Sequence, residues 1–223
     1  MYQVLNRPNE IVVAYDIETC VRSDAKKHLE QADCGFDKRL KDPAKIEESR
    51  KEKRQEAIEK APLYWWHGQI VSVACEEVLS GNKFSICTMD EKKLLTSLFD
   101  YLANLSKADT QMEVSLVGKN SAGFDRGYII GRCIALDLGV PAFMKKTWGT
   151  IDDIDQFFGG KLSSQCGKLS DYAFGIGMEK GGHGSEVAEM VKGERWDDIV
   201  KYNEMDTRIT AEIIKRYMKS WER

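Results

Sequence analysis

Alternating stretches of apolar and polar residues predict the main elements of the chain. Apolar, β-branched residues at 11–15 are typical of a buried strand. Similar patterns predict further strands at 69–75, 83–88 and 114–118, and a short one at 148–154. Apolar residues spaced three or four apart, with capping and breaking residues at the ends, predict helices at 90–104, 123–138, 169–175 and 194–221. Strands first, then alternating helices and strands, indicate an α/β fold: a mixed sheet flanked by helices.

Residues 22–60 have a different character, because Lys, Arg, Asp and Glu dominate them. A polar helix is expected at 44–60, with Pro43 in its first turn. The segment is predicted to be a charged helical insertion after the first strand. Two interpretations stay open: a solvated excursion, or a flap whose basic side chains hold the phosphates of a bound strand. Trp65 and Trp66 follow the segment and are expected to pack at the sheet edge, with base stacking as the alternative.

Two carboxylates stand at alternate positions at the end of the first strand, Asp16 and Glu18. Residues two apart in a strand point to the same face, so both acids project from one side. Like charges held this close raise each other's pKa unless a cation lies between them. Mg²⁺ and Mn²⁺ prefer oxygen ligands, so a metal site is one interpretation. The other is a strand that runs into an acidic, solvated turn.

Two further acids stand where helices are expected. In the last helix, Tyr202, Asp206 and Ile209 share one face, and the lower part of that face is apolar. A carboxylate buried there needs a partner, either a lysine or a metal shared with Asp16 and Glu18. Asp125 stands at a helix start, where it either complements the helix dipole or serves as a fourth acid of the site.

Composition limits the possible functions. The 223 residues, 42% of them hydrophobic, suit one domain over 1–223, and the net charge of −3 provides no overall basic field for nucleic acid. Six scattered cysteines without a C-x-x-C pair argue against zinc and for a reducing compartment. Without a secretion signal or a long apolar stretch, the chain is expected to be cytoplasmic, with no membrane partner.

Three short motifs together resemble the exonuclease motifs of the DEDD superfamily. They are Asp16-Ile17-Glu18-Thr19, the segment Gly118-Lys119-Asn120-Ser121-Ala122-Gly123-Phe124-Asp125, and Tyr202-Asn203-Glu204-Met205-Asp206. Their order, spacing and places on strand, helix start and final helix all fit. Tyrosine four positions before the last Asp resembles the tyrosine subtype (DEDDy). The chain is therefore similar, outside 22–60, to the proofreading exonuclease domains of family A and family B DNA polymerases.

The resemblance implies a ribonuclease H-like (DnaQ-like) fold and two-metal hydrolysis at the 3′ end of single-stranded nucleic acid, with DNA favoured and RNA left open. Asp16, Glu18 and Asp206 would hold one Mg²⁺ or Mn²⁺ ion, and Asp16 with Asp125 a second. Tyr202 would position the attacking water. The implied substrate-binding residues are Thr19, Asn120 and Phe124. A separate polymerase or a replication or repair protein is a further implied partner. The alternatives are a catalytically inactive nucleic-acid-binding module on the same fold and a nuclease that cuts internally.

Overall fold

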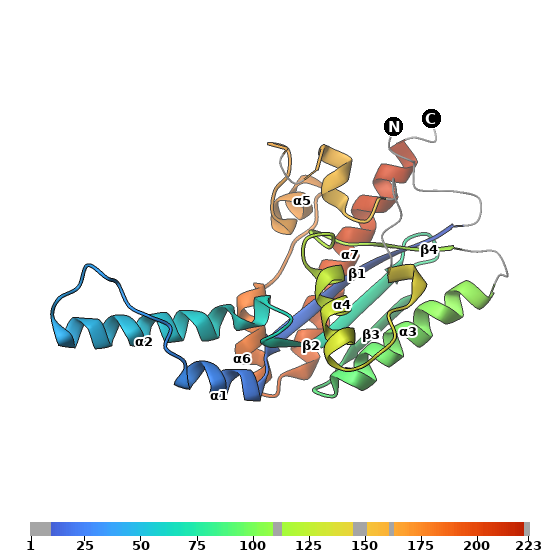
Figure 1. Cartoon of the computed structure of the whole chain (residues 1–223). Coiled ribbons are helices and arrows are strands. Elements are labelled where there is room, and N and C mark those ends of the chain that lie inside the picture. Colours follow the sequence, from blue (N-terminus) through green and yellow to red (C-terminus); the bar gives the residue numbers. More distant parts are fainter. Residues whose placement is uncertain (1–9, 109–112, 145–150, 161–162, 221–223) are drawn as a thin grey trace.

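A four-stranded mixed sheet forms the centre of the molecule (Figure 1). The computed structural model describes residues 10–108, 113–144, 151–160 and 163–220. The strands are β1 (Glu10–Val21), β2 (Gly68–Glu77), β3 (Lys83–Cys87) and β4 (Glu113–Val117), in the order β3-β2-β1-β4. β1 pairs antiparallel with β2 and parallel with β4, and β2 pairs antiparallel with β3. The predicted mixed sheet is confirmed.

Helices cover both faces of this sheet. On one face lie α3 (Glu91–Ala108) and α4 (Asp125–Ala135), and the long α7 (Trp196–Ser220) packs across the other. The shorter elements are α5 (Leu169–Gly175), α6 (Val187–Lys192), and the 3-10 turns η1 (Ala61–Leu63), η2 (Ala142–Met144), η3 (Ile154–Phe158) and η4 (Gly184–Glu186). The predicted arrangement of a sheet flanked by helices is therefore confirmed as well.

The alternation of side chains along β1 divides the core in two. Val13, Tyr15 and Ile17 belong to the cluster beneath α3 and α4. Val12 and Ala14 belong to the cluster beneath α7. Because the side-chain period of a strand is two, even-numbered residues of β1 face α7 and odd-numbered ones face α3 and α4.

The charged segment forms an arm, defined here as residues 22–60, which extends away from the sheet (Figure 1). Its helices α1 (Ser23–Gln31) and α2 (Pro43–Lys60) pack against each other. α2 was predicted; its N-terminus is capped by Asp42, whose Oδ1 accepts a hydrogen bond from the Ala44 N–H at 2.9 Å. α1 was not predicted, since Ala25 and Leu29 are its only buried residues.

A buried ion pair ties α3 and α4 to the turn between the arm and β2. Arg132 donates from Nε and Nη2 to the Glu91 carboxylate, with the shortest contact at 2.7 Å, and the two side chains are only 3% and 5% exposed. Glu91 also accepts a hydrogen bond from the Ile70 N–H at 2.7 Å. Arg132 Nη1 donates to the Trp65 carbonyl oxygen at 3.1 Å, so the pair also fixes the backbone between η1 and β2.

Some boundaries differ from the sequence expectations. β1 continues to Val21, because its last residues pair with the start of β2. The short strand predicted at 148–154 is wrong for its described part: Asp153 makes a single parallel bridge with Gly118, and η3 begins at Ile154. Residues 148–150 and Trp221, the predicted end of the last helix, lie outside the described residues. Across the part of the chain that is described, no helix is both long and apolar enough to span a membrane.

Candidate metal centre

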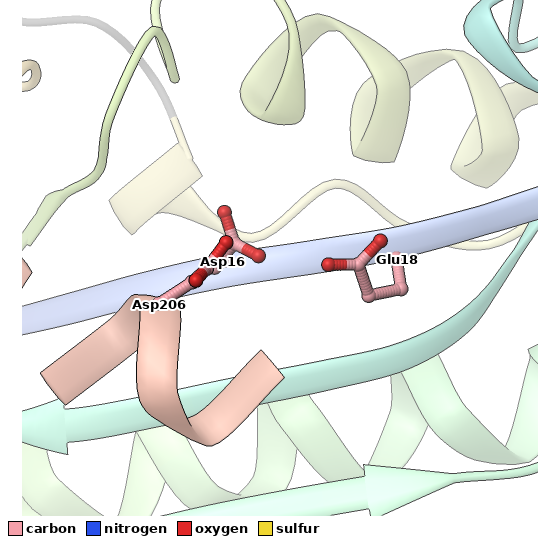
Figure 2. Close-up of side chains that lie close together, drawn as sticks. All are labelled: Asp16, Glu18 and Asp206. Atoms are coloured by element: carbon pink, nitrogen blue, oxygen red, sulfur yellow. The ribbon is translucent and has the colours of Figure 1, made fainter. Parts of the chain in front are cut away.

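Three carboxylates from two elements converge beside the sheet. Asp16 and Glu18 project from β1 toward α7, which carries Asp206 (Figure 2). One carboxylate oxygen from each of the three lies within 4.8 Å of the others. Residues 190 positions apart in the sequence thus form one acidic cluster, called here the acid triad.

The triad interrupts two apolar stripes. On β1 the stripe facing α7 runs Val12, Ala14, Asp16, Glu18 and Cys20, and its first two and last members are buried in hydrophobic clusters. On α7, Asp206 is 6% exposed and lies between the fully buried residues Ile199 and Ile209. Apolar neighbours on both sides deprive the carboxylates of water, and this desolvation disfavours their charged forms.

Burial and mutual repulsion perturb the titration of all three acids. Burial raises the pKa of Glu18 to about 8, and the Asp206 charge adds to the shift. The pKa of Asp16 is raised well above its usual range by burial and then by the charges of Asp125, Glu18 and Asp206. Burial also raises the pKa of Asp206, although a neighbouring lysine opposes the effect. The three carboxylates therefore carry more negative charge than the protein groups around them stabilise.

That lysine is Lys180, which the sequence analysis did not identify. Its Nζ donates to both carboxylate oxygens of Asp206 and, at 3.1 Å, to the hydroxyl oxygen of Tyr202. It also lowers the pKa values of Asp16 and Glu18. Lys180 supplies the one positive charge for the triad among the described contacts, and a cation bound by Asp206 would have to share its oxygens.

Tyr202 lies one helical turn before Asp206 on the same face of α7. Lys180 Nζ lies 4.4 Å from the centre of its ring. Gly182, at φ +71°, passes so close that an added Cβ would lie 3.2 Å from the ring. Burial, followed by the charges of Asp206, Glu18 and Asp16, raises the pKa of Tyr202. Its phenol is therefore neutral at physiological pH and can donate a hydrogen bond.

Asp125 lies close to the triad but outside it. It is the first residue of α4 and 3% exposed, and its Oδ1 accepts a hydrogen bond from the Ile17 N–H at 3.4 Å. Ile17 lies beyond the part of β1 that pairs with β4, so this carboxylate occupies the free edge of the strand. Burial raises its pKa to about 7, and among charges Asp125 has the largest effect on Asp16. Both interpretations of Asp125, at the helix start and near the site, are compatible with this position.

The three residues expected to contact substrate have structural partners here. Thr19 donates its hydroxyl to the Pro62 carbonyl oxygen at 2.8 Å. Asn120 has φ +59°, and its N–H donates to Asp153 Oδ1 at 3.1 Å. Phe124 precedes α4 and packs at 5.3 Å, ring centre to ring centre, against Tyr128. These contacts hold the backbone around the triad, and the substrate roles stay predictions.

The donor set of the triad suits a hard divalent cation. All three candidate ligands are carboxylate oxygens, which Mg²⁺ and Mn²⁺ prefer over the softer ligands of zinc or copper. A bound cation would also relieve the repulsion that raises the three pKa values. The cluster could thus hold one metal ion, with Asp125 near enough to affect it electrostatically.

The raised pKa values predict an unusual pH dependence of stability without metal. The ordinary pKa of Glu18 is 4.5 and its folded value is about 8. Between these pH values the folded protein binds more protons than the unfolded chain, so the free energy of unfolding falls as pH rises. We expect Tm in chelator to drop from about pH 5 to about pH 8, by the equivalent of a few kcal/mol.

Thermal unfolding of matched variants checks this expectation. Glu18→Gln should flatten the decline, whereas Glu194→Gln, at an exposed position, should leave it in place. Mn²⁺ should raise Tm more near pH 8 than near pH 5, because it binds the deprotonated carboxylates. A Tm that rises with pH in chelator, with Glu18 intact, would contradict the electrostatic account.

Comparison with known proteins gives a match at the level of fold. No model of a known protein family matches the sequence, and no curated protein sequence matches it. Among solved structures, the chain is similar to the family B DNA polymerase from the hyperthermophilic archaeon Pyrobaculum calidifontis, with a TM-score of 0.60 and 16% sequence identity. The match covers 92% of this chain and 24% of the polymerase chain. This likeness is compatible with a ribonuclease H-like fold.

Proposed function

We propose that the chain is a metal-dependent 3′–5′ exonuclease of the tyrosine subtype, acting on single-stranded nucleic acid and on DNA in preference to RNA. The main support for this proposal is the acid triad, together with the position of Tyr202 one helical turn before Asp206. The polymerase-like fold adds support, as does the order of the three sequence motifs. Residues 1–223 would then form one exonuclease domain, which could work beside a separate polymerase or repair protein.

Each residue has a role that its environment supports. Asp16, Glu18 and Asp206 would hold a Mg²⁺ or Mn²⁺ ion, and Asp125 with Asp16 a second. Bound there, the ions would lower the pKa of a coordinated water and neutralise charge on the phosphate.

Two neighbours of the triad complete the proposed site. The Tyr202 phenol, whose pKa is raised, is a poor base and would instead donate a hydrogen bond that orients the attacking water. Lys180 would stabilise negative charge that develops at the phosphate, since its ammonium group already lies between Tyr202 and Asp206.

Loss of the Tyr202 hydroxyl should slow turnover and spare binding. Tyr202→Phe keeps the ring beneath Lys180 and removes only the O–H group. An aligned proton donor or orienting group typically contributes about 10²–10⁴ in rate, so single-turnover hydrolysis should fall within that range. Affinity for an oligonucleotide in Ca²⁺ should be preserved. Unchanged single-turnover rates would assign Tyr202 to packing alone.

One assay distinguishes the proposed function from its alternatives. The protein is incubated with Mn²⁺ and single-stranded DNA labelled at the 5′ end, and the products are resolved by length. An exonuclease of this polarity gives a ladder that shortens stepwise from the 3′ end, and a 3′-terminal phosphorothioate should slow it. Internal fragments from the first time point would indicate an endonuclease, and binding without cleavage would indicate a non-catalytic module. A parallel RNA strand tests the preference for DNA.

A further inference from the structure

Two exposed aromatic side chains at the root of the arm have no role in the site described above. Tyr64 and Trp66 are 42% and 49% exposed, and their rings stack with centres 4.9 Å apart and planes 24° from parallel. Most large aromatic side chains reduce their exposure by packing into the core. We call this pair the aromatic platform.

The backbone beneath the platform is held firmly. Trp65, which stands between Tyr64 and Trp66 in the sequence, points into the core instead. Its ring packs so closely on Gly131 that a Cβ added to the glycine would lie 2.4 Å from it. The Trp65 carbonyl oxygen accepts a hydrogen bond from Arg132, the partner of Glu91. The Tyr64 carbonyl oxygen accepts hydrogen bonds from the N–H groups of His67 and Gly68, at 3.0 and 2.8 Å. The exposed rings are therefore presented on an ordered turn.

The platform is joined directly to the strand that carries the acids. Thr19, the residue after Glu18, donates to the carbonyl oxygen of Pro62 at 2.8 Å. The Arg22 N–H donates to the His67 carbonyl oxygen at 3.1 Å. Val21, which pairs with Gly68, lies three residues beyond Glu18, or about 10 Å along a strand. A strand of a few nucleotides could reach both the triad and the platform.

Charge and chemistry favour nucleic acid as the occupant. The protein has a net charge of −3, so it cannot rely on a broad positive field to attract a polyanion. Base stacking on an aromatic face needs no such field and accepts every base. The adjoining arm has twelve Lys or Arg against ten Asp or Glu, so the platform borders the part of the chain that is slightly positive.

We propose that the aromatic platform is a stacking site for the bases of a single strand whose 3′ end lies at the acid triad. This inference rests on the proposed function for the direction of the strand. The rings would stack on bases a few nucleotides from the terminus and hold the strand independently of its sequence. Phosphates would lie toward the arm.

Binding of two strands with equal charge tests the stacking. Affinity is measured in Ca²⁺ for an oligothymidine and for an abasic strand of the same length, with wild type, Trp66→Leu and Phe174→Leu. Leucine is apolar but not planar, so it separates stacking from general hydrophobic contact. Phe174 is the matched control, an 87% exposed aromatic on α5 with no contact to the arm among those described.

Wild type should bind oligothymidine more tightly than the abasic strand. Trp66→Leu should weaken oligothymidine binding by about 5- to 100-fold, the size of one base–aromatic stack, and remove the preference over the abasic strand. Phe174→Leu should bind as wild type. Tyr64→Leu provides the same comparison if Trp66→Leu does not fold.

Equal affinity of wild type for both strands, or wild-type binding by both platform variants, would overturn the inference and leave the aromatic pair as a surface for a protein partner. Failure of the proposed function would look different. In that case the preference for bases would depend on Trp66 while wild type produced no ladder in Mn²⁺.

Discussion

Asp206→Asn should abolish metal-dependent hydrolysis while leaving the fold intact. Asp206 offers one of the three candidate ligand oxygens of the triad, and its side chain is buried, with 6% exposed. Changing groups behind a metal ligand typically costs about 10- to 100-fold in metal affinity or activity, so loss of a ligand itself should exceed about 10²-fold. The fold should survive, because Lys180 also interacts with Asp16 and Glu18.

The matched control is Asp197→Asn, the same substitution at an exposed position in the first turn of the same helix. It should hydrolyse the end-labelled strand at the wild-type rate. Circular dichroism and the Mn²⁺-induced change in Tm separate a lost metal site from a lost fold. Wild-type hydrolysis by Asp206→Asn at saturating Mn²⁺ would remove the triad from the proposed mechanism.

The largest effect on stability is expected at Glu91 and Arg132. Both side chains are almost fully buried, so Glu91→Ala leaves an arginine without its carboxylate and the Ile70 N–H without an acceptor. Removing one member of a buried pair costs about 3–5 kcal/mol. For a chain of this size that corresponds to a fall in Tm of about 6–20 °C. Urea unfolding measures the free energy directly.

Two further variants show whether the loss of stability in Glu91→Ala comes from the unpaired buried charge. Glu91→Leu with Arg132→Met replaces both charges and should recover much of the stability, because an unpaired buried charge costs more than an apolar pair. Glu212→Ala breaks an exposed pair with Arg216 on α7 and should cost less than about 1 kcal/mol. If Glu91→Ala and Glu212→Ala lowered the free energy of unfolding by similar amounts, burial would not determine how much the Glu91–Arg132 pair contributes to stability.

Local patterns in the sequence predicted the sheet and most helices because those elements bury continuous apolar segments or regular apolar stripes. β2 is buried without interruption from Ile70 to Cys75, and α7 buries residues spaced three to four apart. α1 and α6 were missed for the opposite reason. α1 buries two side chains, and α6 has only six residues, so neither has enough periodic apolar positions to stand out.

For the candidate site, the sequence indicated the acids but not the lysine that offsets their negative charge. Asp16 and Glu18 were suspected because two carboxylates on one face of a strand repel each other, and Asp206 because a carboxylate buried beside an apolar stripe needs a partner. Lys180 lies in a short connection rich in glycine, where no periodicity marks one residue as different from the next. Only the three-dimensional path of the chain brings its ammonium group between Tyr202 and Asp206. The contact of Thr19 with Pro62 gave no sequence signal either, because the two residues are 43 positions apart.

The pairing of Val21 with Gly68 also bears on how the chain folds. β1 and β2 form a hairpin whose ends are separated by the 46 residues 22–67, where a short turn would suffice. Each doubling of loop length adds about 0.6 kcal/mol of closure entropy, so an unstructured connection would slow the pairing of the two central strands. α1 and α2 pack against each other, so the connection folds back on itself. Packed in this way, the arm brings the two strand ends near each other and shortens the loop that the pairing of β1 with β2 has to close.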